Sequence, residues 1–166
     1  MMKVRIIASI SIMIPLVTVI TMLIRVPIPA TQGYFNFGDA AVILVSMLFG
    51  PYVGLIAGGV GSSLADIISG FSNYALVTLF AKGMEGLVAG AIFRRLHKKS
   101  RFLFYLSGPV GGLLMISSYF VFESYFFSLG NALVELPLNI LQVVLGSIIS
   151  YMLYALVYPL LTKVSM

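Results

Sequence analysis

Apolar runs of helix length, separated by short connections, dominate this chain. They predict six membrane-spanning helices, because about 20 consecutive apolar residues span a bilayer. The expected spans are Val4–Ile24, Gly38–Gly50, Pro51–Ser69, Tyr74–Phe93, Phe102–Phe127 and Pro137–Leu161. The second run is the shortest, so its helix is expected to be short, tilted or shielded by protein. The expected fold is all-α, one transmembrane domain over residues 1–166.

The connections differ in length and polarity. Arg25–Phe37 is an unusually long connection for so compact a chain, and loops of that length tend to be functional. Gly70–Asn73 is expected to be a tight turn, and Ser128–Glu135 a second polar loop before a helix that starts at Pro137. The first apolar run is too long for a cleavable signal peptide and lacks a small-x-small cleavage site, so it is expected to be the first span.

The basic residues predict the orientation, because nearly all of them lie in every second connection. One face of the membrane would hold Lys3, Arg5, Arg94, Arg95, Lys98, Lys99, Arg101 and Lys163. The opposite face would hold only Arg25, and Lys82 lies within a span. The positive-inside rule then makes both termini cytoplasmic and the Arg25–Phe37 loop external.

Composition supports lipid as the solvent of this chain. It is 60% hydrophobic and 9% charged, with a net charge of +5, which is too little charge to cover a water-soluble surface. The basic residues flank apolar spans, so they favour anionic lipid headgroups over nucleic acid as their partner. The absence of cysteine excludes disulfides and thiolate chemistry.

Ionisable residues inside the spans are candidates for function. Lys82 and Glu85 are neighbours on one helix, and with Thr78 they form a polar strip that rises to Asn73 and Tyr74. The two charges either neutralise each other or line a ligand pocket.

A second candidate is Asp66, which lies on a stripe of small residues suited to close helix packing. The stripe is Gly54, Gly58, Ser62, Asp66 and Gly70. Two roles for Asp66 are equally compatible with the sequence: a functional carboxylate, or a structural partner for a helix end or an arginine. Asp39 and Glu135 lie near expected helix starts, so capping is the favoured role for both.

Further polar pairs fall at the same depth on the last two spans. Tyr119 and Glu123 share one helix face, and Asn139 and Gln142 share another. Together with Tyr34 and Asn36 in the external loop, they indicate a pocket with a lid that opens outward.

Catalytic and metal-binding motifs do not emerge. Gly59–Ser63 resembles a nucleophile turn, but His97, the only histidine, lies in the basic cluster. Neither a phosphate-binding Gly-x-x-x-x-Gly-Lys loop nor metal-ligand spacing is present. We therefore expect no enzyme activity, cofactor or metal. A stand-alone channel or a structural membrane subunit is the alternative, although the inner halves of the last two spans look apolar.

The chain resembles the substrate-binding S components of energy-coupling factor (ECF) vitamin transporters, especially the riboflavin-type branch. The likeness rests on Gly38-Asp39-Ala40-Ala41, Leu48-Phe49-Gly50-Pro51, Ala57–Ser62, Ala65-Asp66, Lys82-Gly83 and Glu85–Gly90. It implies a six-helix protein of the prokaryotic cytoplasmic membrane that binds a vitamin from outside. It also implies a transmembrane coupling subunit (the T component) and two cytoplasmic ATPases as partners. Family members often dock through an Ala-x-x-x-Ala pair in span one. Here the fourth residue after Ala8 is Ile12, and Ser11 is the nearest small residue.

The resemblance also points to ligand-binding residues and a ligand class. The expected contacts are Tyr34, Asn36, Asn73, Tyr74, Thr78, Lys82, Glu85, Tyr119, Glu123, Asn139 and Gln142. Pyridoxine or hydroxymethylpyrimidine is the preferred ligand, with riboflavin or pantothenate as the alternative. The absence of tryptophan argues against thiamine.

Overall fold

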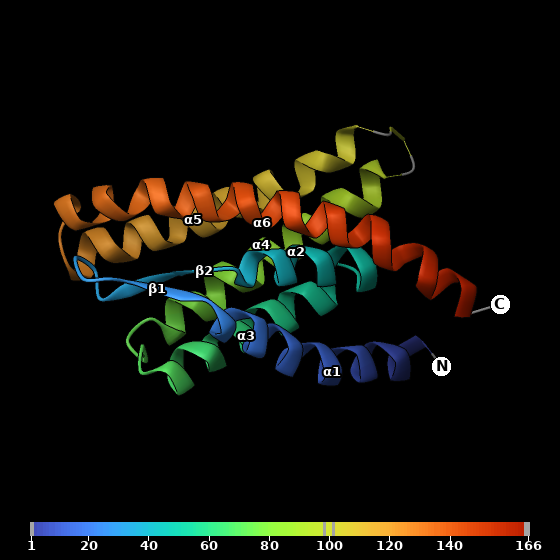
Figure 1. Cartoon of the computed structure of the whole chain (residues 1–166), viewed down its shortest axis with the longest axis horizontal. Helices are drawn as coiled ribbons and strands as arrows, with labels where there is room; N and C mark the ends of the chain where they lie inside the picture. Colours follow the sequence, from blue (N-terminus) through green and yellow to red (C-terminus); the bar gives the residue numbers. More distant parts are fainter. Residues whose placement is uncertain (1, 98, 101, 165–166) are drawn as a thin grey trace.

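The described part of the chain folds into six α-helices and one β-hairpin (Figure 1). The computed structural model describes residues 2–97, 99–100 and 102–164. The helices are α1 (Met2–Leu23), α2 (Gly38–Phe49), α3 (Pro51–Ser69), α4 (Ala75–Leu96), α5 (Ser107–Phe126) and α6 (Leu129–Val164), with a short 3-10 helix η1 (Leu103–Leu106) before α5. Five segments are long and apolar enough to cross a membrane, α5 being counted together with η1. The prediction of an all-α, multi-span membrane protein is confirmed.

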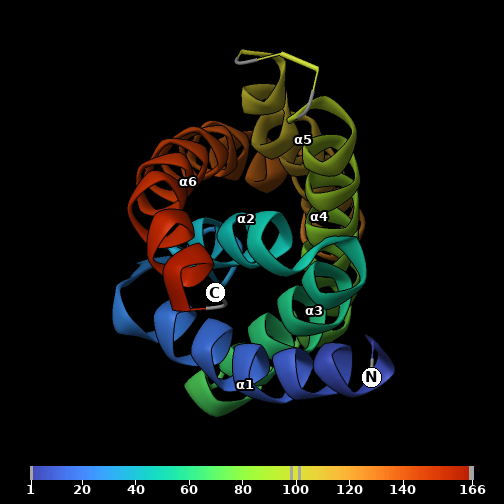
Figure 2. The same cartoon turned by 90° about the vertical axis from the view of Figure 1, so that its right-hand side faces the viewer.

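Helix α2 is the shortest of the six and lies at the centre of the bundle, with the other helices around it (Figure 2). Nine of its twelve residues are buried. Val42 and Val45 pack with Val17 of α1 and Ala57 of α3, while Met47 and its neighbour Ile43 pack with α4 and α6. The surrounding helices shield α2 from lipid, which confirms one of the expectations for this short run.

Local sequence sets the ends of α3. Pro51 occupies the first turn, where its missing N–H and fixed φ suit a helix start. Gly70 ends the helix with φ +87°, a left-handed conformation that glycine adopts readily. The chain then turns directly into α4, which packs along α3.

The long first connection contains a β-hairpin. Strand β1 (Arg25–Ile28) pairs antiparallel with β2 (Gly33–Asn36), in a register that places Arg25 opposite Asn36. The hairpin lies at the end of the bundle opposite the chain termini (Figure 1). We call these two ends of the molecule the hairpin end and the terminal end.

The predicted second polar loop at Ser128–Glu135 is wrong, because α6 already begins at Leu129 and Pro137 lies inside it. Buried positions recur along this helix at Ala132, Glu135, Asn139, Val143 and Ser147. That spacing is helical, and it places Glu135, one of the polar residues that suggested a loop, in the interior of the bundle, whereas Ser128 is exposed.

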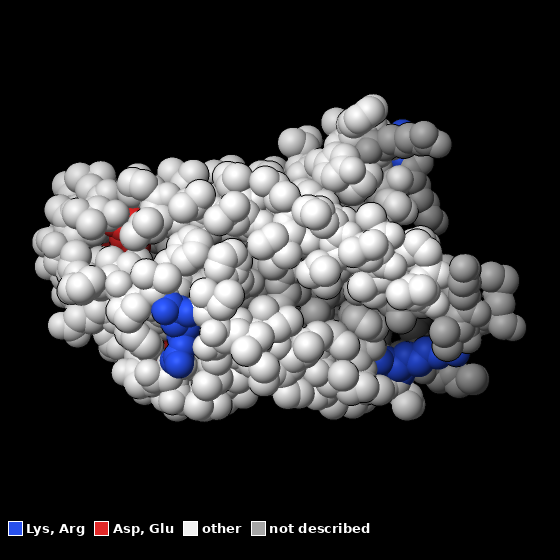
Figure 3. Space-filling view, viewed as in Figure 1, with Lys and Arg blue, Asp and Glu red and all other residues white. Residues whose placement is uncertain are grey.

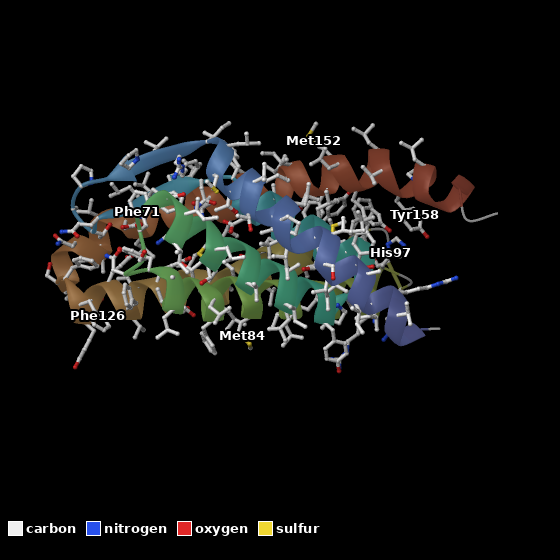
Figure 4. The ribbon with its side chains drawn as sticks, turned by 90° about the horizontal axis from the view of Figure 1, so that it is seen from below. Phe71, Met84, His97, Phe126, Met152 and Tyr158 are labelled. Atoms are coloured by element: carbon white, nitrogen blue, oxygen red, sulfur yellow. The ribbon has the colours of Figure 1, made fainter. Side chains whose placement is uncertain are left out.

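The outer surface of the bundle is largely apolar. On the face shown in Figure 3, small blue and red areas interrupt an otherwise uncharged surface. Met84 and Met152 point outward from the middle of the bundle, whereas His97 and Tyr158 lie at the terminal end (Figure 4). Of the basic residues behind the expected orientation, Lys98 and Arg101 lie outside the described residues, as do the side chains of Lys3 and Lys163.

Candidate functional site

A polar pocket lies beneath the hairpin, lined by residues from β2 and five of the helices. The lining residues are Thr21, Gly33, Tyr34, Asn36, Ser62, Asp66, Tyr74, Thr78, Lys82, Tyr119, Glu135, Asn139 and Gln142. The open space among them is about 20 Å³, room for roughly one water molecule. A ligand the size of a vitamin therefore requires the lining or the hairpin to move.

Hydrogen bonds to α6 and to Tyr74, at the start of α4, hold the hairpin over the pocket. The Tyr74 hydroxyl of α4 donates to the Thr31 carbonyl at 2.8 Å, and the Thr31 hydroxyl donates to Glu135 of α6. The backbone N–H of Asn36 donates to Gln142 Oε1 of α6 at 2.9 Å. These contacts make the hairpin a cover whose position depends on the same side chains that line the site.

Tyr34 connects the hairpin to α3. Its hydroxyl donates to Asp66 Oδ1 at 2.6 Å, and its ring packs against Phe71 with 4.5 Å between centroids. Burial, with a further contribution from the Asp66 charge, raises the pKa of the Tyr34 hydroxyl. Tyr34 thus remains a neutral hydrogen-bond donor to this carboxyl group.

Lys82 lies on the α4 wall of the pocket with two acidic partners. Its ammonium forms an ion pair with Asp39 of α2 and lies 3.5 Å from Glu85 Oε2. All three side chains are almost fully buried. The interpretation in which Lys82 and Glu85 neutralise each other is therefore correct but incomplete, because Asp39 is a third member.

The capping roles predicted for Asp39 and Glu135 are wrong. The N-terminus of α2 has no side-chain cap, and Asp39 pairs with Lys82 instead. Glu135 lies well inside α6 and contacts Thr31 of the hairpin. Both carboxyl groups thus connect segments that are distant in the sequence.

Aromatic side chains form one wall of the pocket. Tyr74 and Tyr119 lie with ring centroids 6.2 Å apart, and the Tyr119 hydroxyl is hydrogen-bonded to Thr78 at 2.9 Å. Tyr and Phe rings can flank a planar heterocycle while the surrounding hydroxyl, amide and carboxyl groups orient its polar atoms.

Most of the residues expected at the site converge there. Eight of them line the pocket: Tyr34, Asn36, Tyr74, Thr78, Lys82, Tyr119, Asn139 and Gln142. Asn73 is exposed, Glu85 lies behind Lys82, and Glu123 is buried but does not line the pocket.

The structure adds lining residues that sequence reasoning did not select. Thr21 and Gly33 are new, and Ser62 was assigned to helix packing along with the rest of its stripe. Asp66 and Glu135 line the pocket although other roles were also weighed for them. Ser62 lies one helical turn from Asp66 on the same face of α3, and that spacing was the available signal.

Comparison with known proteins identifies the family. A family model described as "ECF-type riboflavin transporter, S component" matches residues 1–159. The chain belongs to this family of ECF S components. The match spans nearly all the residues that build the bundle, the hairpin and the pocket.

Two relatives of this S component share long alignments with it. The thiamine precursor transporter HmpT of Lactococcus lactis subsp. cremoris is 31% identical over 132 residues, covering 79% of this chain and 74% of HmpT. A Pyrococcus woesei protein described as an uncharacterized protein in the gap 3' region is 47% identical over 133 residues, covering 80% and 88% of the two chains.

A solved structure shares the fold of this S component. It is described as the S component of a bacterial ECF transporter and superposes with a TM-score of 0.67. The sequences are 23% identical, and the superposition covers 96% of this chain and 98% of that one.

Proposed function

We propose that this S component binds a small water-soluble vitamin precursor, hydroxymethylpyrimidine or pyridoxine, in the pocket beneath the hairpin. The observation that carries the proposal is the composition of the pocket wall. Donors and acceptors from six segments surround a space flanked by tyrosines. Such a site suits a planar ring with several polar substituents.

The choice of ligand follows from the relatives and from the size of the site. HmpT is named as a thiamine precursor transporter, and hydroxymethylpyrimidine is such a precursor. The pocket is nearly filled by its own side chains, so a single ring requires less rearrangement than a tricycle. Riboflavin is the second candidate, because the matching family model carries its name.

We further propose that the hairpin end faces outward and that both termini are cytoplasmic. Basic residues flank the spans on the side assigned to the cytoplasm, as the positive-inside rule requires. The ligand would then be released into the cytoplasm, chemically unchanged, through the action of a T component and two ATPases.

Calorimetric titration of the purified protein in detergent tests the ligand. We expect hydroxymethylpyrimidine or pyridoxine to bind more tightly than riboflavin, pantothenate or thiamine. Tighter binding of riboflavin would favour the second candidate, and no binding of any of them would refute the proposal.

A matched pair of asparagine variants on α6 locates the site. Asn139 lines the pocket, whereas Asn131 lies on the same helix outside it. Asn139→Ala is expected to weaken binding by about tenfold through the loss of a hydrogen bond. Asn131→Ala should bind as the unmodified protein does, and equal losses in both variants would argue against this pocket.

A further inference from the structure

All five acidic residues of the chain are buried, and each lies in or beside the pocket. Asp66 and Glu135 line it, Asp39 and Glu85 contact its lining residue Lys82, and Glu123 is close enough to Glu135 for the two groups to interact electrostatically. None of the five is more than 4% exposed. Every acidic side chain of this otherwise basic protein thus lies in or beside the pocket.

One buried amine faces this group of acids. Lys82 is paired with Asp39 and Glu85, so its charge is already matched. Among the described residues, Asp66, Glu123 and Glu135 form no ion pair with Lys, Arg or His. Buried carboxylates are stable when a cation or several donors accompany them. The described residues therefore leave these three acidic side chains without a cationic partner, and a positively charged ligand could provide one.

Asp66 is the acid whose geometry best suits a ligand. It is 3% exposed, lines the pocket, and accepts one hydrogen bond at Oδ1 from Tyr34. Its other oxygen, Oδ2, is buried without a hydrogen-bond partner. A carboxylate has about four lone-pair positions, so both oxygens remain able to accept from a donor pair inside the pocket.

The groups around Asp66 leave that position to a ligand. Tyr34 faces it from β2 and Thr78 from α4, and the Thr78 hydroxyl also pairs with Tyr119 of α5. Tyr74, Lys82 and Glu135 are the other ionisable side chains that line the pocket, and each has a partner of its own. The tyrosine rings can also stabilise a cationic ring between them.

We propose that the pocket binds its ligand as a cation, an amino-substituted nitrogen heterocycle protonated on the ring nitrogen. The ring N–H and the adjacent amino group donate two parallel hydrogen bonds to Asp66, as an amidinium does to a carboxylate. The ring nitrogen takes its proton from water or from the Asp66 carboxyl group, so one O–H bond breaks and one N–H bond forms, and no bond between heavy atoms changes. This inference rests on the proposed function and deepens it, because hydroxymethylpyrimidine carries such an edge and pyridoxine, riboflavin and pantothenate do not.

The Asp66→Asn variant tests whether the ligand is bound as a cation or as a neutral molecule. An amide can form two hydrogen bonds with a neutral aminopyrimidine edge, as it does with adenine, but it cannot compensate a positive charge. We expect Asp66→Asn to weaken hydroxymethylpyrimidine binding about tenfold to a hundredfold. Binding that is unchanged or tighter would overturn the proposal.

Measuring a second ligand on both proteins gives a double-mutant-type cycle, in which Asp66 and the amino group of the ligand are changed separately and together. In the analogue with a hydroxyl in place of the amino group, the donor pair is lost, so Asp66→Asn should alter its affinity much less. Equal losses for both ligands would show that Asp66 does not contact the amino edge, and would also overturn the proposal.

The ultraviolet spectrum of the bound ligand tests the same point on the unmodified protein. We expect bound hydroxymethylpyrimidine to show the spectrum of its acid form at a pH where the free compound is neutral. A neutral spectrum would refute the cationic form even if Asp66→Asn fails to fold. Binding of pyridoxine without hydroxymethylpyrimidine would refute this inference and leave the proposed function standing, whereas binding of neither compound to the unmodified protein would refute the proposed function.

Discussion

Lys82 and its two acidic partners form a compact charged cluster in the bundle core. Asp39 comes from α2, and Glu85 from the next turn of α4. An ammonium buried among apolar helices is stable only while such partners remain. At the scale of single residues, Lys82 therefore both lines the pocket and stabilises the fold.

Replacing Lys82 with methionine should strongly destabilise the fold. The change leaves Asp39 and Glu85 buried without their cation, and breaking a buried pair costs about 3 to 5 kcal/mol. Unfolding of the purified protein in detergent, followed by circular dichroism, measures the loss. Lys99→Met, at an exposed lysine, serves as the control and should leave stability unchanged.

The double variant Lys82→Met with Asp39→Asn should recover part of the loss, because one unpaired carboxylate is removed. If the free energy of unfolding of Lys82→Met lies within about 1 kcal/mol of that of the unmodified protein, the cluster does not stabilise the fold. Ligand affinity measured on the same samples then reports whether Lys82 also contacts the ligand.

Sequence alone could select many of the site residues but not their pairings. Lys82 attracts attention because it is a charge within an apolar run. Its partner Asp39 lies on another helix, near a helix start, where capping is the common role. Glu135 meets Thr31 across 104 positions of sequence. Such contacts depend on tertiary packing, which spacing along one helix does not encode.

At the scale of elements, α3 and α4 approach each other so closely that parts of their interface exclude side chains. A Cβ on Gly86 would lie 2.6 Å from the carbonyl carbon of Gly54. Backbone cannot move aside as a flexible side chain can. Small residues thus hold together the two helices that carry Ser62, Asp66, Thr78 and Lys82.

Gly86→Ala should separate these two helices and destabilise the protein by about 3 kcal/mol, near the upper end for overpacking. Gly130, in the first turn of α6, is a matched control because a Cβ there would meet only Ser128 Oγ at 3.8 Å. Gly130→Ala should change the free energy of unfolding by less than about 1 kcal/mol. Equal effects in the two variants would contradict the close-packing argument.

The ends of the elements were harder to predict than their existence. All six helices follow from apolar runs, and Pro51 and Gly70 mark the ends of α3 correctly. The start of α6 was missed by eight residues, because Asn131, Glu135 and Pro137 resemble a polar connection. Glu135 is accommodated within the helix because it lines the polar pocket, whereas Asn131 lies outside the pocket. The hairpin was likewise read as an irregular loop.

At the scale of the whole molecule, the hairpin end and the terminal end differ in chemistry. The hairpin end carries the pocket and the buried acids. The basic residues Arg94 and Arg95 lie in the last turn of α4, toward the terminal end, and Lys99 follows the helix. This asymmetry is what the orientation proposed above depends on.

Single cysteines in this cysteine-free chain can report the orientation. Gln32 at the hairpin tip and Lys99 after α4 are both exposed. In intact cells, an impermeant thiol reagent should label Gln32→Cys and spare Lys99→Cys. Both should be labelled after permeabilisation, which controls for reactivity. The reverse pattern in intact cells would invert the orientation.

Uptake should depend on partner subunits. The sequence lacks a phosphate-binding loop, so the chain alone should bind hydroxymethylpyrimidine in liposomes without concentrating it. Co-reconstitution with a T component and two ATPases should give ATP-dependent accumulation. Accumulation by the chain alone, driven by an ion gradient, would instead indicate a secondary transporter.

The length of α6 has a consequence for the surrounding bilayer. Its apolar part, Leu129–Leu160, has 32 residues, or about 48 Å of helix, against a hydrocarbon core of about 30 Å. Tilting alone would have to exceed the usual range to hide this excess. The membrane next to α6 must therefore thicken, or the helix must extend into the headgroup region, whereas α3 with 19 residues fits without adjustment. In the first case, the side of the protein formed by α6 favours a thicker bilayer than the side formed by α3, and uptake should vary with lipid chain length.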